Sequence, residues 1–89
     1  MKETLNSNNR KTLLNRLNNL YIELAHIKTS IANEIARINQ IENKKELKED
    51  KRKEYLFNSN NYLFNMTINQ KITESNIKFI NEIITENEY

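Results

Sequence analysis

The chain has 89 residues, a formal net charge of +2, and no glycine, proline or cysteine. Without cysteine it has no disulfides or thiolate metal sites, and without glycine it has no glycine-rich phosphate loop. This length allows one domain at most, which we assign to residues 1–89. Heavy use of asparagine, lysine and isoleucine indicates AT-rich coding, which is typical of some bacteria, phages and plasmids.

The location of the protein follows from what its sequence lacks. No apolar run approaches the roughly 20 residues that span a bilayer. The first residues also lack the apolar core of a secretion signal. We therefore expect a cytoplasmic protein that does not enter a membrane.

The first predicted element is a long helix over residues 9–42, after a polar arm at 1–8. Ser7 and Asn8 are both good N-cap residues for its start. Large apolar residues then recur at alternating steps of three and four, the pattern of a coiled-coil seam. Heptad position a holds Leu17, Leu24, Ile31 and Ile38, and position d holds Leu13, Leu20, Ile27 and Ile41. Apolar residues at position e widen this face toward that of a helical bundle: Leu14, Tyr21 and Ile35.

Glu34 interrupts the seam at position d. One interpretation is a polar residue within the seam that fixes the register or the oligomeric state. The other is a local rotation that brings Ile35 into the core and leaves Glu34 at its edge. We favour the rotation, because Ile35 is adjacent and apolar.

The seam ends at Ile41, and the next segment is highly charged. Asn43 is a helix stop signal, and the charged residues 44–54 contain only one large apolar side chain. The segment could bend the chain back or continue as a solvated helix. We predict a turn within residues 43–50.

The second helical region, residues 51–87, has apolar side chains on two sides. Residues 55–58 (YLFN) recur at 62–65, one heptad later. Two further stripes lie on nearly opposite faces of a helix, which usually means a neighbour on each. The first stripe contains Phe57, Phe64, Ile68, Ile72, Phe79 and Ile83, and the second contains Tyr55, Met66, Ile77, Ile80 and Ile84. Breaks at 59–61 and 73–75 would give three helices instead of two, with Ser75 as an N-cap.

These patterns predict an all-α fold, a long helical hairpin of two or three helices with coiled-coil-like packing. Because one hairpin supplies a neighbour for only one side of the second region, we expect a homodimer or higher oligomer that forms a helical bundle. The predicted oligomer or partner interface contains Leu17, Leu20, Leu24, Ile27, Ile31, Ile38, Tyr55, Phe57, Tyr62 and Phe64.

The sequence contains no catalytic, cofactor or metal motif. His26 is the sole histidine, at position c on the outer side, and has no carboxylate placed to orient it. We therefore expect no enzyme, no cofactor and no metal. The chain is expected to be a small interaction protein that binds itself and another protein as a regulator, inhibitor or scaffold, in keeping with an accessory protein of a phage or plasmid.

The alternative is a small dimeric regulator that binds nucleic acid. Phosphate binding needs a surplus of basic charge on one surface. In the segment 44–54 acidic residues interleave with the basic ones, so we expect a solvated charged face more than a binding patch. The candidate contacts are Arg10, Lys11, Arg16, Lys51, Arg52 and Lys53.

Overall fold

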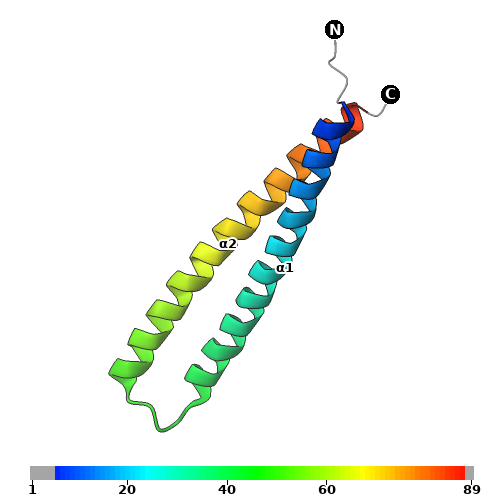
Figure 1. The fold of residues 1–89 in the computed structure, drawn as a ribbon. Helices are drawn as coiled ribbons and strands as arrows, with labels where there is room; N and C mark the ends of the chain where they lie inside the picture. Colours follow the sequence, from blue (N-terminus) through cyan, green and yellow to red (C-terminus); the bar gives the residue numbers. More distant parts are fainter. Residues whose placement is uncertain (1–5, 88–89) are drawn as a thin grey trace.

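Two long antiparallel helices form an extended hairpin in the computed structural model, which describes residues 6–87 (Figure 1). Helix α1 is Ser7–Asn43 and helix α2 is Glu49–Glu86. The hairpin measures 65 × 19 × 15 Å, and its radius of gyration is 19.8 Å, against about 12 Å for a compact protein of this length. The two ends of the described chain lie together, opposite the turn. The predicted all-α hairpin is confirmed.

Helix α1 starts at Ser7, with Asn6 as its cap. The backbone of Asn6 is extended, and its side-chain oxygen accepts a hydrogen bond of 2.8 Å from the backbone N–H of Asn9. The prediction of Ser7 or Asn8 as the cap was therefore wrong by one or two residues. At the other end, the side-chain amide of Asn43 donates to the carbonyl of Asn39 at 2.9 Å.

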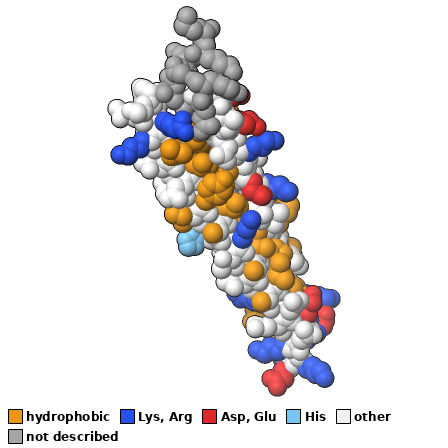
Figure 2. All heavy atoms as spheres, turned by 90° about the vertical axis from the view of Figure 1, so that its right-hand side faces the viewer, with side chains coloured by type: hydrophobic (Ala, Val, Ile, Leu, Met, Phe, Trp, Pro, Cys, Tyr) orange, Lys and Arg blue, Asp and Glu red, His pale blue; other side chains and the backbone are white. Residues whose placement is uncertain are grey.

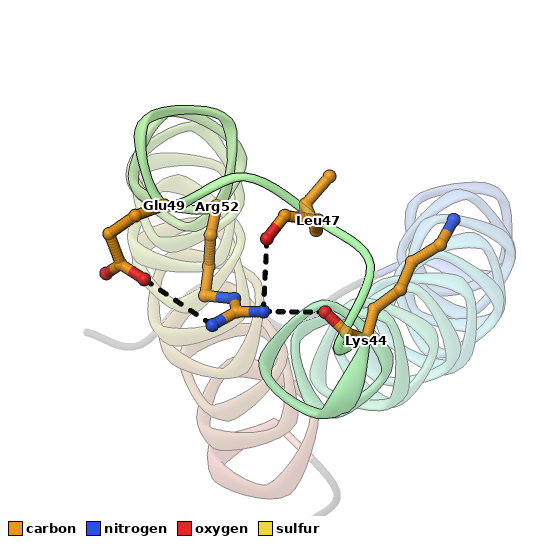
Figure 3. Close-up of polar contacts among 4 residues, drawn as sticks. All are labelled: Lys44, Leu47, Glu49 and Arg52. Atoms are coloured by element: carbon orange, nitrogen blue, oxygen red, sulfur yellow. Dashed lines mark hydrogen bonds and ion pairs between the residues drawn. The ribbon is translucent and has the colours of Figure 1, made fainter.

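Arg52 holds the turn between the helices (Figure 3). Its Nη2 donates to the carbonyl of Lys44 at 2.6 Å and to that of Leu47 at 3.5 Å, and its Nη1 lies 3.5 Å from the carboxylate of Glu49. Carbonyls that follow a helix end lack intrahelical partners, and a guanidinium has several N–H donors with which to satisfy them. No described residue has a positive φ, so the turn closes without glycine geometry. The backbone N–H of Leu47 also donates to the carbonyl of Lys44 at 3.3 Å, beside the bonds from Arg52.

Replacing Arg52 by methionine is expected to lower the free energy of unfolding by about 1 kcal/mol, because the carbonyls of Lys44 and Leu47 lose their side-chain donor. The reduction should appear as a lower midpoint in urea denaturation followed by circular dichroism. Lys45→Met is the matched control, since Lys45 is exposed in the same turn. Equal effects of the two substitutions would contradict the role of Arg52 in the turn.

The core is a single seam along the facing sides of the two helices. In α1 it follows the predicted heptad positions, with Ile27 and Ile41 the most buried. In α2 the covered side chains recur at alternating steps of three and four. They are Leu56, Ser59, Leu63, Met66, Gln70, Thr73, Ile77, Ile80 and Ile84. The apolar end of this seam, at Ile77, Ile80 and Ile84, lies toward the chain termini.

Helix α2 is continuous, so the three-helix alternative is wrong. Residues 59–61 and 73–75 are helical, and Ser75 lies in the interior of the helix. Ser59 and Thr73 are among the most buried side chains of the described chain because they occupy seam positions. A polar residue at such a position weakens the apolar pattern without ending the helix, and this segment has no glycine or proline to break it.

Glu34 keeps its place in the seam, contrary to the rotation that we expected. It is half-buried and lines a cavity together with Ser59, whereas 47% of Ile35 is exposed. The heptad continues through Glu34 because Ile31 and Ile38, on either side, are held against α2. The seam is therefore polar at this level.

Candidate protein-docking surface

A row of large apolar side chains lies on the outer face of α2. This outer stripe contains Phe57, Phe64, Ile68, Ile72 and Phe79, whose exposed fractions are 66%, 66%, 42%, 54% and 62%. Isolated exposed apolar side chains are common, but five large ones along one face of a helix mark a candidate interaction site.

The outer stripe follows from the positions of these residues in α2. At about 100° per residue, they point roughly 180° away from the seam. The helix can turn only one of its two apolar sides toward α1, and α1 covers Met66, Ile77, Ile80 and Ile84. The two-sided pattern of the sequence therefore appears as one covered and one exposed side.

Helix α1 also exposes apolar side chains at the rim of the seam. Leu14, Tyr21 and Ile35, at heptad position e, are each 44–49% exposed. Figure 2 shows hydrophobic side chains running along one long side of the hairpin. Near its open end, an open groove of about 640 Å³ lies between Tyr21 and the last turns of α2, where the side-chain amide of Asn81 donates to the Tyr21 hydroxyl at 3.4 Å.

The total surface area agrees with this exposure. The hairpin exposes 7242 Å², whereas a compact protein of its mass exposes about 5,500 Å². A single layer of two helices covers one side of each and leaves the others in solvent. The excess area is the consequence of this shape, and a further neighbour would reduce it.

The ten predicted interface residues fall into three groups. The six from α1 (Leu17, Leu20, Leu24, Ile27, Ile31 and Ile38) lie in the seam within the hairpin. Phe57 and Phe64 belong to the outer stripe. Tyr55 and Tyr62 lie beside the seam, 40% and 43% exposed, and line a cavity of about 530 Å³ with Arg37 and Glu34. Two of the ten therefore face away from the rest of the hairpin.

The six basic candidates lie at opposite ends of the hairpin. Arg10, Lys11 and Arg16 are at the start of α1, and Lys51, Arg52 and Lys53 are in the first turns of α2, next to the connecting turn. Arg52 binds the turn carbonyls, and the Lys51 ammonium lies 3.4 Å from the Glu54 carboxylate. Within one hairpin these groups do not form a continuous basic surface.

Residues 6–87 contain no group of three or more histidine, aspartate or glutamate side chains placed to hold a metal ion. His26 is exposed on α1. In the same part of the chain, neither helix has a stretch apolar enough to cross a membrane.

Five seam residues of α2 were missed by the sequence reasoning: Leu56, Ser59, Leu63, Gln70 and Thr73. Three of them are polar, so a search for apolar side chains passes over them, and the two leucines were considered only as members of the YLFN repeat. The signal that could have found them is the unbroken alternation of steps of three and four from Leu56 to Ile84. Comparison of the chain with family models, curated proteins and solved structures finds no match.

Proposed function

We propose that this chain is a non-enzymatic helical interaction protein that self-associates and binds another protein as a regulator, inhibitor or scaffold. The observation that carries the proposal is the outer stripe of α2, a long apolar surface that α1 does not cover. Helical surfaces of this kind recognise other helices through side chains at regular spacing along one face.

The rim of α1 supports the same proposal. Tyr21 and Ile35 expose nearly half of their surface beside the seam, and the groove next to Tyr21 also has Leu24 and Ile77 in its lining. Aromatic side chains contribute strongly to protein interfaces because they bury a large area with few rotatable bonds. A hairpin with apolar side chains on both helices can contact a second copy and a different protein at the same time.

Binding of nucleic acid has less support. The basic side chains are divided between the two ends of the hairpin, and Arg52 is engaged in the turn. A protein that neutralises several phosphates needs those charges along one surface. We expect no binding to DNA or RNA even at low salt. Binding that disappears at moderate salt, and on changing Lys51 and Lys53 to glutamate, would support the alternative.

The proposed function is tested by retention of proteins from an extract of the source cell on the immobilised chain, with identification by mass spectrometry. We expect at least one protein other than the chain itself to be retained by the wild type and lost with Ile35→Asp or Ile68→Asp, because each substitution puts a charge on an apolar surface. Asn33→Asp is the control, since Asn33 is exposed on another side of α1 and should retain the same protein. If both variants retain everything that the wild type retains, the proposal is overturned.

A further inference from the structure

The outer stripe is symmetric about Ile68. Phe57 and Phe79 lie eleven residues before and after it, and Phe64 and Ile72 lie four residues before and after it. At 1.5 Å per residue, the paired positions are about 16 Å and 6 Å from Ile68 along the helix. The apolar side chains of the stripe therefore lie at the same distances from Ile68 in both directions along α2.

We propose that the outer stripe docks on the outer stripe of a second copy, with the two α2 helices antiparallel about a two-fold axis at Ile68. Phe57 of one protomer then faces Phe79 of its partner, Phe64 faces Ile72, and Ile68 faces Ile68. A two-fold interface requires such self-complementarity, in which residue i contacts j and j contacts i. This inference rests on the self-association in the proposed function and names its surface and geometry.

The outer stripe supplies much of the area that a stable dimer needs. A phenylalanine side chain buries about 200 Å², so the three that are 62–66% exposed offer about 800 Å² in a pair of protomers. The two isoleucines of each stripe and the flanking side chains add to this. Stable interfaces bury about 1,200–2,000 Å² in total.

The shape of the stripe suits two nearly straight helices. Its eleven-residue spacing corresponds to 3.67 residues per turn, close to the 3.6 of a straight α-helix, so the stripe stays nearly parallel to the helix axis. Antiparallel helices also place their dipoles favourably.

One pair of charged side chains at the edge of the stripe agrees with the antiparallel arrangement. Lys53 and Glu82 are exposed on the same edge of the stripe and lie 15 and 14 residues from Ile68. In the antiparallel pair, Lys53 of each protomer therefore lies beside Glu82 of its partner.

The rest of the hairpin does not obstruct this dimer. The outer stripe points away from α1, so α1 of each protomer lies on the far side of its own α2. The four helices form one layer in the order α1, α2, α2, α1. The rims of both α1 helices stay accessible to another protein.

Light scattering after size exclusion tests the dimer. At micromolar concentration we expect twice the chain mass for the wild type and the mass of one chain for Ile68→Asp, because the substitution places two carboxylates against each other on the two-fold axis. Helical circular dichroism should be retained by this variant. The control is Asn69→Asp, an exposed position about 100° around the helix, which should stay dimeric. A monomeric wild type, or a dimeric Ile68→Asp, would overturn the proposal.

Cysteine cross-linking tests the orientation, since the natural chain has no cysteine. Asn61 and Ser75 are exposed and lie seven residues on either side of Ile68, so each faces the other in the antiparallel dimer. A mixture of Asn61→Cys and Ser75→Cys should cross-link between the two variants with a short bismaleimide. Cross-linking of Asn61→Cys only to itself would show parallel helices and overturn the proposal. If the wild type is monomeric, the dimer proposal fails, but the retention experiment still tests whether the chain binds another protein. The two failures can therefore be distinguished.

Discussion

Ile80→Asp is expected to abolish the folded hairpin. Ile80 is the most buried apolar side chain of the described residues, 5% exposed, and lies between Ile77 and Ile84 in the apolar end of the seam. A carboxylate there loses most of its water without gaining a partner, which costs several kcal/mol. Domains of this size have only about 5–10 kcal/mol of stability, so the helical signal in circular dichroism should fall to that of an unfolded chain at 25 °C.

Ile22→Asp is the matched control for this prediction. Ile22 has the same side chain in the other helix but is 50% exposed on the outer side of α1. Substitutions at such positions usually change stability by less than about 0.5 kcal/mol. A folded Ile80→Asp, or equal loss of helix in both variants, would show that the seam at Ile80 does not hold the helices together.

Glu34→Leu is expected to raise the free energy of unfolding by about 1 kcal/mol. Position 34 is a half-buried d position of the seam, where a leucine would pack against α2 and where the carboxylate is partly removed from water. A fully buried leucine contributes about 1.5–3 kcal/mol, and a half-covered one about half of that. The increase should appear as a higher midpoint in urea denaturation at an unchanged slope.

Glu23→Leu is the control for the Glu34 substitution. It makes the same change on α1, at an exposed position beside the seam, and should leave the midpoint within about 0.5 kcal/mol of the wild type. A loss of stability in Glu34→Leu would instead mean that the carboxylate makes a favourable interaction in the folded protein. Glu34 and Ser59 line the same cavity, so Ser59 would be the first residue to examine.

These two predictions concern different parts of one seam. Its end near the termini is apolar, with Ile77, Ile80 and Ile84, while Ser59 and Thr73 make other levels polar. Polar side chains at seam positions reduce the apolar area that folding buries. The seam of a single hairpin therefore contributes only modest stability. Covering the outer stripe with a partner would stabilise the same α2 helix further.

Much of the architecture could be predicted from the sequence. Alternating steps of three and four between Leu13 and Ile41 predict a long helix with one packed side, and the charged segment after Asn43 marks the turn. Helix α1 ends at Asn43 and α2 begins at Glu49. The two apolar sides of α2 were also visible, because helical periodicity alone determines the angle between Met66 and Ile68.

Only the tertiary structure decided which side of α2 faces α1. Both sides carry large apolar residues, and the outer one has three phenylalanines. A rule that buries the more apolar side against α1 would therefore have chosen the outer side, which is wrong. The heptad from Leu56 to Ile84 aligns with that of α1 along the whole helix, which lets two long helices stay in contact despite Ser59, Gln70 and Thr73.

The positions of Glu34 and Arg52 likewise depended on the packed hairpin. Glu34 stays in the seam because its apolar neighbours one turn away, Ile31 and Ile38, keep that side of α1 packed against α2. Arg52 reaches Lys44, eight residues earlier, only after the chain has reversed. By itself the sequence determined the helices, their apolar sides and the place of the turn, since these follow from local periodicity and composition. The choice of the covered side and the bonds across the turn come from contacts between distant residues, which local patterns do not contain.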